Sequence, residues 1–162
     1  MHIEFCQLHG SIRRGRGFGD AYSWVEEDMG RLLTELKQAG TDEVVPPVTI
    51  TSGEIRRKID AGTVVILACD ADNGDRVVGM ASLIPLWKLS GDKGTIEDVV
   101  VDKECRGYGI ARKLMEILHR HAKRLRLTAL ELTSNPKRVE ANKLYQSMGY
   151  VLRETNMYLL KL

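Results

Sequence analysis

A run of β-branched residues that leads through two glycines into an amphipathic helix constrains this chain more than any other feature. The run TIEDVVVD (residues 95–102) holds three successive valines, which predict a strand covered on both faces, near the centre of a sheet. The stretch CRGYGIARK (residues 105–113) follows it closely. Apolar residues then recur at the spacing of one helix face, at Ile110, Leu114, Ile117, Leu118 and Leu125. The sequence therefore predicts a central strand, a glycine turn and a helix in direct succession.

Further strands and helices are predicted around this unit. Apolar spacing predicts helices at residues 22–40, from the capping residue Ser52 onward, and at residues 135–150. Runs rich in β-branched and other strand-forming residues predict strands at residues 63–70, 76–87, 127–134 and 155–162. Asn73 and Gly74 predict a hairpin turn between the first two of these strands. This order of elements predicts an α/β fold with a mixed sheet.

The glycine turn at residues 107–109 does not match the common nucleotide-binding motifs. A dinucleotide turn requires a third glycine where this chain has Arg112, and the Gly-Lys-Ser/Thr of a P-loop does not follow. Arg112 and Lys113 stand in the first turn of a helix, where the helix dipole disfavours cations by about 0.3–1 kcal/mol. An anion held by the free N–H groups of that turn would reverse the sign. The alternative is a plain turn beside solvated cations.

Composition argues against several classes of partner. The 162 residues include 24 Lys and Arg against 22 Asp and Glu, so neither nucleic acid nor a membrane is expected as a partner. The basic stretch at residues 119–126 holds no aromatic residue and is interpreted as a solvated helix face. Cys6, Cys69 and Cys105 form no metal-ligand pattern, so we expect reduced thiols and no metal. No signal-like or membrane-spanning run is present, which predicts a cytoplasmic protein.

Arg106, Gly109 and Ala111, in the pattern Arg-x-x-Gly-x-Ala after a valine-rich strand, resemble the pyrophosphate loop of the GNAT superfamily of acetyl-CoA-dependent N-acetyltransferases. The elements that follow, ending in ANKLYQSMGY, agree with that family in order and spacing. The resemblance implies an α/β (α+β) fold with a mixed, mostly antiparallel sheet of six to seven strands and about four helices. It implies one acetyltransferase domain, with variable N-terminal helices on the acceptor side (residues 1–62) and an acetyl-CoA-binding core (residues 63–162).

The resemblance also implies which residues hold acetyl-CoA. Backbone groups of Val99, Val100 and Val101 would bind the pantetheine arm, which in this family adds to the fourth strand like an extra strand. The loop and the following helix would wrap the pyrophosphate through Arg106, Gly107, Tyr108, Gly109, Ile110, Ala111 and Arg112. Asn135 and Asn142 are further candidates for the pantetheine arm, with a helix cap as the alternative role of either carboxamide.

Two residues are implied in catalysis. Tyr145 matches the tyrosine that the family places near the thioester sulfur, where a phenol protonates the departing thiolate. Its alternative role is the packing of a half-buried helix tyrosine on the sheet. Glu97 matches the family's common base, whereas strand alternation places Asp98 on the opposite face. The alternatives are Asp98 as the base, a water chain with no dedicated base, or carboxylates that only hydrogen-bond to a loop.

The acceptor is left open, beyond transfer of the acetyl group directly to a primary amine. IEDVVVD is similar to the fourth strand of glucosamine-6-phosphate acetyltransferases, yet this chain reads SNPKR (residues 134–138) where that family tends to be acidic. Protein lysines and small amines such as polyamines, amino acids or antibiotics are equally open, as is a non-catalytic acyl-CoA sensor. Lys137 and Arg138 form either an anion site or a solvated pair. A homodimer and the role of the glycine-rich loop at residues 13–20 are also open.

Overall fold

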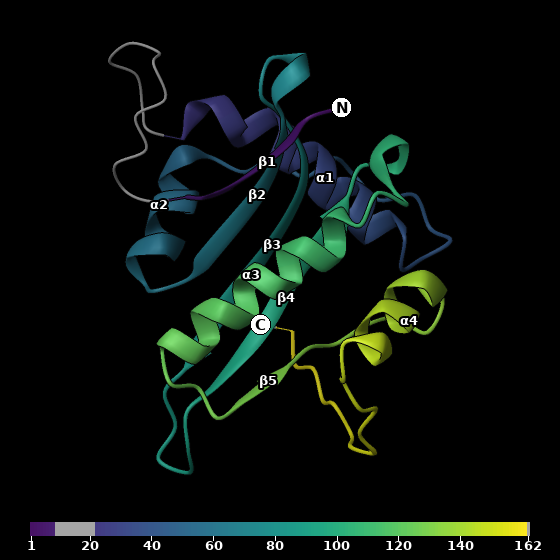
Figure 1. Ribbon diagram of the computed structural model, residues 1–162. Coiled ribbons are helices and arrows are strands. Elements are labelled where there is room, and N and C mark those ends of the chain that lie inside the picture. Colours follow the sequence, from purple (N-terminus) through teal and green to yellow (C-terminus); the bar gives the residue numbers. More distant parts are fainter. Residues whose placement is uncertain (9–21, 162) are drawn as a thin grey trace.

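Five strands form the sheet at the centre of the structure (Figure 1), a computed structural model that describes residues 1–8 and 22–161. The strands are β1 (Ile3–Gln7), β2 (Val64–Asp70), β3 (Arg76–Leu86), β4 (Lys93–Val101) and β5 (Ala129–Glu131). They lie side by side in sequence order; β1 to β4 pair antiparallel, and β5 runs parallel to β4. The mixed α/β fold is confirmed, but the described residues form five strands rather than six to seven.

Helices cover both faces of this sheet. Within the described residues the α-helices are α1 (Glu26–Gln38), α2 (Ser52–Asp60), α3 (Ile110–Arg124) and α4 (Val139–Ser147). Short 3-10 turns occur at Ser23–Val25, Ala71–Asn73 and Lys103–Cys105. One core lies under α1 and α2 and includes Leu32 and Ile55, while the other lies under α3 and α4 and includes Leu118 and Tyr145. Successive residues of β2 alternate between the two cores, as expected for a strand covered on both sides.

Helix boundaries differ slightly from the prediction. The cap of α2 is Thr51 rather than Ser52, because the Thr51 hydroxyl accepts a hydrogen bond from the Glu54 N–H while the Glu54 carboxylate accepts one from the Thr51 N–H. Helix α1 ends at Gln38, two residues before the predicted end at Gly40. The predicted loop at residues 13–20 lies outside the described residues.

A bulge in β4 shapes the region that the sequence marks as functional. Asp98 has a φ of 55°, in the left-handed region that non-glycine residues rarely adopt, and the register between β3 and β4 shifts at the same place. The three valines beyond the bulge are at most 8% exposed; Val99 and Val101 pack towards α3, and Val100 packs towards α1. The prediction of a strand covered on both faces is therefore confirmed.

Helix α3 approaches β3 closely at Gly79. A Cβ atom at this position would lie 3.2 Å from Ile110 Cγ2 and 3.4 Å from Leu114 Cδ1, both on the first turns of α3. It would also lie 3.3 Å from the Val100 carbonyl oxygen of β4. The missing side chain thus allows the start of α3 to rest on the sheet, next to the end of β4.

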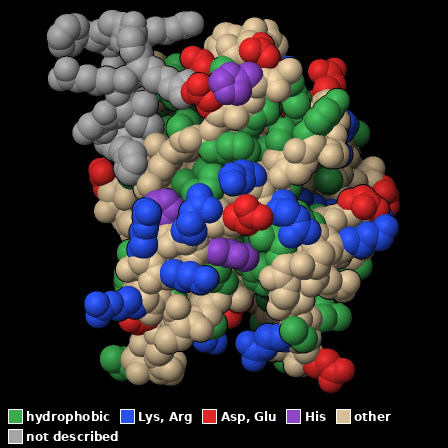
Figure 2. Space-filling model, in the orientation of Figure 1, with side chains coloured by type: hydrophobic (Ala, Val, Ile, Leu, Met, Phe, Trp, Pro, Cys, Tyr) green, Lys and Arg blue, Asp and Glu red, His purple; other side chains and the backbone are tan. Residues whose placement is uncertain are grey.

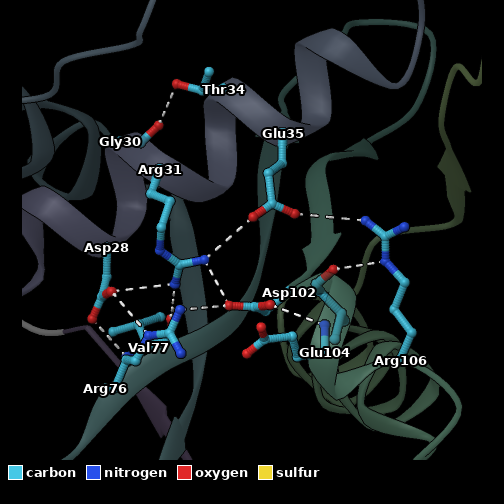
Figure 3. A network of polar contacts seen from close by, with 11 residues as sticks. Asp28, Gly30, Arg31, Thr34, Glu35, Arg76, Val77, Asp102, Glu104 and Arg106 are labelled. Carbon is cyan, nitrogen blue, oxygen red and sulfur yellow. Dashed lines mark hydrogen bonds and ion pairs between the residues drawn. The ribbon is translucent and has the colours of Figure 1, made fainter.

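A partly buried ionic network joins α1 to the end of β4 (Figure 3). The Asp102 carboxylate accepts hydrogen bonds from Arg31 Nη1 at 2.7 Å and from Arg76 Nη2 at 2.9 Å. Arg31 also forms ion pairs with Asp28 and Glu35 on its own helix. Because Asp102 is only 4% exposed, two guanidinium partners are needed to offset the desolvation of its charge. The network fixes α1 beside the strand end from which the glycine turn departs.

The strands differ from the prediction in three places. The sequence does not predict β1, because its five half-buried residues at a sheet edge show little apolar alternation. β5 is three residues long, whereas a strand over residues 127–134 was predicted. The prediction of a closing strand at residues 155–162 is wrong for the described part, because residues 151–161 form no strand and are all exposed.

The basic stretch at residues 119–126 lies along the outer side of α3. Arg120, Lys123 and Arg124 are exposed, whereas Leu118 and Ala122 on the inner side are buried. Figure 2 shows Lys and Arg side chains over this face, with acidic and histidine side chains among them. The charged residues of the stretch therefore belong to the polar side of an amphipathic helix, as the sequence predicts.

Candidate active site

Two cavities meet along the part of β4 that has no neighbour on the β5 side. β5 pairs with β4 only from Lys93 to Thr95, so the described residues form no strand beside the rest of β4 on that side. The larger cavity, of about 700 Å³, lies along the three valines and the glycine turn. The smaller one, of about 310 Å³, lies beside Glu97 and Asp98. Both cavities are lined by Leu36, Val99, Arg138 and Tyr145.

The larger cavity collects most of the residues predicted to bind the cofactor. Its lining includes Val99, Val100, Val101, Arg106, Gly107, Gly109, Ile110, Ala111 and Arg112. Gly107 and Gly109 have φ angles of 86° and 75°, and no heavy atom lies within 4 Å of a Cβ built on either. Gly109 caps α3 without any side-chain hydrogen bond, and the first turn of α3 holds no acidic residue. The N–H groups of this turn are therefore free to meet an anion in the cavity.

Three of the predicted binding residues lie elsewhere. Tyr108 is 71% exposed and lines neither cavity, and Asn142 lines neither. Asn142 Nδ2 donates to the Asn135 carbonyl at 3.0 Å. Asn135 lines the smaller cavity, where its Nδ2 donates to the Gly40 carbonyl at 2.8 Å and its Oδ1 accepts from the Lys137 N–H at 2.9 Å. Both carboxamides are thus engaged in holding the turn before α4.

The cationic side chains of the loop are engaged by protein groups. Arg106 Nε donates to the Val101 carbonyl at 3.0 Å, and its Nη2 lies 3.7 Å from Glu35 Oε2 on α1 (Figure 3). Arg112 Nη2 donates to Ser147 Oγ on α4 at 2.6 Å. Because the Arg106 guanidinium points towards α1, its side chain braces the loop against that helix.

Glu97 and Asp98 both line the smaller cavity, although strand alternation predicts opposite faces for them. The left-handed backbone of Asp98 breaks the alternation, which explains the difference. Ser82 Oγ, on β3, lies 3.2 Å from the Glu97 carbonyl and 3.4 Å from Asp98 Oδ2, positioned to donate to either. The bulge thus brings two carboxylates to one wall.

Burial raises the pKa of both carboxyl groups. The pKa of Glu97 is raised first by desolvation and then by the negative charge of Asp98. Desolvation also raises the pKa of Asp98, partly offset by the Ser82 hydrogen bond and by the charges of Lys58 and Lys37. A carboxylate whose pKa is raised holds a proton more strongly, which makes Glu97 a better general base near neutral pH.

Tyr145 lies where the two cavities join. It is 5% exposed and its ring packs edge-on against Tyr150, with 6.1 Å between centroids. Burial raises the pKa of Tyr145; the Arg138 charge lowers it and the Glu97 charge raises it further. The phenol is therefore protonated at neutral pH and can donate a proton or a hydrogen bond. Behind it, Tyr150 has a pKa raised to about 12 by burial, and its hydroxyl lies 2.8 Å from His119 Nε2.

Arg138 has a more specific place at this site than the sequence predicts, where it stands only as one of two adjacent cations with Lys137. Its Nη2 donates to the Val99 carbonyl at 2.9 Å, immediately after the bulge. Its neighbour Lys137 is instead exposed and paired with Asp42. Neither cation is merely solvated. The signal available in the sequence was an arginine at a helix start, three residues after Asn135.

A comparison with protein families identifies the chain. The model of the family described as "Acetyltransferase (GNAT) family" matches residues 32–150, well over half of the sequence. This chain belongs to the GNAT acetyltransferase family. The enzyme is therefore an acyltransferase, and the resemblance drawn from the glycine loop is confirmed. No curated protein sequence matches it significantly.

Solved structures with the same fold differ in what their names say they acetylate. An acetyltransferase of Trypanosoma brucei is 24% identical over 99% of this chain and 100% of its own, with a TM-score of 0.64. A glucosamine-6-phosphate N-acetyltransferase of Arabidopsis thaliana is 20% identical over 99% of both chains (TM-score 0.66). An aminoglycoside acetyltransferase from an uncultured soil metagenomic sample is 20% identical, over 100% of this chain and 99% of its own (TM-score 0.71). At such identities the likeness concerns the fold alone.

The residues of this GNAT acetyltransferase fit acetyl-CoA, the cosubstrate of the family. The larger cavity combines open glycine positions, a helix start without a side-chain cap and a part of β4 that has no described strand beside it, which suit a phosphate-bearing, amide-containing ligand. Among the described residues, no group of three or more His, Cys, Asp or Glu side chains could hold a metal ion. No helix in the described ranges is long and apolar enough to span a bilayer.

Proposed function

We propose that the enzyme transfers the acetyl group of acetyl-CoA directly to a primary amine where the two cavities join. One observation carries the proposal: Val99, Arg138 and Tyr145 line both cavities, so a donor in the larger and an acceptor in the smaller would meet at these residues.

On the donor side, backbone groups of Val99 to Val101 bind the pantetheine arm as an added strand. Support comes from β4 itself, which has no described strand beside these residues on the β5 side. The glycine turn and the first N–H groups of α3 hold the pyrophosphate. Arg138 already donates to the Val99 carbonyl, and a carbonyl oxygen has a second lone pair for a pantetheine amide. Arg138 therefore orients the strand at the place where the thioester lies.

On the acceptor side, Glu97 removes a proton from the amine, because an ammonium has no lone pair with which to attack. The amine nitrogen then forms a bond to the acetyl carbonyl carbon, the carbon–sulfur bond of the thioester breaks, and the nitrogen releases its second proton to solvent. Tyr145 gives its phenol proton to the departing thiolate and is reprotonated from solvent. The raised pKa of Glu97 suits a base near neutral pH, and the raised pKa of Tyr145 keeps its phenol protonated there, so that a proton is present when the thiolate departs.

The charges around the smaller cavity favour a cationic amine over a sugar phosphate. Glu97 and Asp98 line it, and Arg138 is the one Lys or Arg among the described lining residues. The Arg138 guanidinium is engaged with the Val99 carbonyl, and Lys137 is paired with Asp42 outside the cavity. Two carboxylates on the cavity wall attract an ammonium group and repel a phosphate, and the cations that act on Asp98, Lys37 and Lys58, are not among the lining residues.

The test is a thiol-release assay with acetyl-CoA and a panel of acceptors: a polyamine, amino acids, an aminoglycoside, glucosamine 6-phosphate and a lysine peptide. We expect CoA release with cationic amines and little with the sugar phosphate. Acetyl-CoA binding without release for any acceptor would instead show a sensor domain. As a control, Glu97→Gln should bind acetyl-CoA normally in isothermal titration while it loses turnover.

A further inference from the structure

Glu35, on α1, lines the larger cavity, the one to which the proposed function assigns the pyrophosphate. A carboxylate beside a phosphate normally weakens binding, because like charges repel. Glu140, which also lines this cavity, is exposed and ion-paired with Lys143 on its own helix. The Glu35 side chain is only 21% exposed. Its charge therefore has to be balanced by partners within the protein.

Two arginines face the Glu35 carboxylate, one at each oxygen. Arg31 Nη1 donates to Oε1 at 3.3 Å, and Arg106 Nη2 lies 3.7 Å from Oε2 (Figure 3). Oε2 is buried and accepts no hydrogen bond from any described residue. A shift of less than about 1 Å would bring Arg106 Nη2 to the ordinary N–O hydrogen-bond distance of about 2.9 Å. The carboxylate thus stands between an arginine of α1 and the first residue of the loop at residues 106–111.

The two arginines differ in how firmly they are held. Arg31 is fixed by further contacts, because it also donates to Asp102 at 2.7 Å and to the Val77 carbonyl at 3.0 Å. The Arg106 side chain is 53% exposed, so it is the less restrained partner of Glu35. Arg31 therefore holds Glu35 in place, and Glu35 presents a fixed negative charge to Arg106.

We propose that Glu35 is a positioning residue for acetyl-CoA, which acts by holding the Arg106 guanidinium against α1 and thereby fixing the loop at residues 106–111. The inference rests on the proposed binding of the pyrophosphate to this loop. Arg106 immediately precedes Gly107, whose φ of 86° is in a region open mainly to glycine. An ion pair on the residue before this glycine limits the freedom of the turn. The first helix of the chain thus contributes to donor binding, in addition to the acceptor side to which the sequence assigns it.

A carboxylate can serve both arginines at once, whereas an amide cannot. Each carboxylate oxygen accepts hydrogen bonds, but an amide has one oxygen and an NH₂ group that donates. In Glu35→Gln one guanidinium would therefore face N–H donors. Repulsion and positioning predict opposite results for this variant. Removal of the charge tightens CoA binding if Glu35 only repels the phosphates, and release of Arg106 weakens it if Glu35 positions the loop.

The first test is calorimetric titration of CoA into the wild-type enzyme and two variants. Glu35→Gln should raise the Kd for CoA about fivefold or more, because it removes one ion-pair partner of Arg106. Glu104→Gln is the matched control, since it removes the charge of an exposed glutamate next to the loop that lines neither cavity, and its Kd should stay within about twofold. A Kd for CoA that is unchanged or lower in Glu35→Gln would overturn the inference.

Pantetheine, which lacks the pyrophosphate, separates a positioned loop from a general loss of structure. Its Kd, measured by ligand-observed NMR, should stay within about twofold in Glu35→Gln, because the arm binds along β4 rather than at the loop. An equal loss of affinity for CoA and for pantetheine would overturn the inference.

A double-mutant cycle and hydrogen exchange show whether Glu35 acts through Arg106. In the Arg106→Gln background, Glu35→Gln should change the Kd for CoA by less than about twofold, because the partner is already absent. Without ligand, the amides of residues 106–111 should exchange faster in Glu35→Gln than in the wild type or in Glu104→Gln. Additive effects or unchanged exchange would overturn the inference. A wild-type enzyme that does not bind CoA would contradict the proposed function, and the exchange rates would still decide whether Glu35 positions the loop.

Discussion

Arg138 and Val99 are joined across the active site: Nη2 of the arginine, at the start of α4, donates to the valine carbonyl of β4 at 2.9 Å. The valine follows Asp98, whose left-handed backbone turns the strand out of its regular register. A side chain from a different element thus supports the irregular part of the strand. The two cavities share both residues, so the contact lies where donor and acceptor would meet.

Arg138→Gln should lower kcat/KM about tenfold or more, because a charge-assisted hydrogen bond contributes roughly 1.5–3 kcal/mol. The loss of its charge should also raise the pKa of Tyr145 further, since the Arg138 charge lowers that pKa. Steady-state kinetics and an ultraviolet titration of the phenol measure the two effects. Lys143→Gln, which removes an exposed cation of α4 that lines neither cavity, is the control; equal effects of both variants would contradict a specific role for Arg138.

Tyr145→Phe should lower kcat by about 100-fold and leave the Kd for acetyl-CoA within threefold, because removal of a general acid typically costs 10²–10⁴ in rate. The ring remains, so the packing against Tyr150 is kept. Stopped assays give kcat and fluorescence titration gives Kd. Tyr150→Phe removes a hydroxyl that contacts His119 and should retain most of the rate. An unchanged kcat in Tyr145→Phe would remove Tyr145 from the acid role.

Glu97 should set the acidic limb of the pH–rate profile. Its pKa is raised by burial and by the charge of Asp98, so kcat/KM should fall as the pH drops through a value above the ordinary glutamate pKa. In Asp98→Asn the limb should move to lower pH, because the repelling charge is gone. Glu97→Gln should lose about 100-fold in rate at pH 7 and show no such limb. A profile that is the same in all three proteins would assign the base to water.

Asp98→Asn should also stabilise the fold at neutral pH. The folded state raises the pKa of Asp98, so this group favours folding fully only below its unfolded-state pKa, and that contribution is lost as pH rises through the folded-state pKa. A neutral asparagine avoids the desolvated charge and tolerates the left-handed backbone. We expect Tm to rise by roughly 2–4 °C at pH 8. Below the ordinary aspartate pKa the difference should vanish, and an equal rise at both pH values would contradict this cause.

Gly109→Val should weaken acetyl-CoA binding at least tenfold. Gly109 has a φ of 75°, so valine adds backbone strain of about 1–2 kcal/mol and also places a branched side chain at the N-terminus of α3. Gly74→Val separates the two effects. Gly74 lies in the hairpin turn between β2 and β3 with a φ of 67° and an equally open Cβ position. Tm should fall by a similar amount in both variants, whereas calorimetry should show weaker acetyl-CoA binding only for Gly109→Val.

The sequence was sufficient for the parts of the fold that local pattern determines. The valine run, the glycine turn and the amphipathic α3 are each specified by neighbouring residues, and all three were predicted. The capping box of α2 could also be recognised from the sequence, because Thr51 and Glu54 have the required spacing, although Ser52 is the predicted cap. The prediction of a closing strand is wrong for a different reason. Residues 155–161 have strand-forming composition, but no described strand pairs with them.

The sequence predicts which residues form the site better than it predicts how their side chains are arranged. The valines and the loop are expected together from the sequence, and apart from Tyr108 they line one cavity. Strand alternation, however, predicts opposite faces for Glu97 and Asp98. The left-handed backbone of Asp98, which brings both to one cavity, cannot be recognised from the sequence. The direction of the Arg106 side chain likewise depends on Glu35, about seventy residues earlier in the chain. Contacts between distant segments of this kind cannot be read from local patterns.

Gly79 touches neither cavity, yet it determines how near α3 stands to the strands. A methyl group there would press on Ile110 and Leu114 and push the helix start outward by a few tenths of an ångström. The gap between the helix and β4 would widen with it. A residue of β3 that lines neither cavity therefore sets the distance between β4 and the start of α3, where we propose that the pyrophosphate binds. Gly79→Ala should accordingly weaken acetyl-CoA binding although every side chain that lines the cavities is kept.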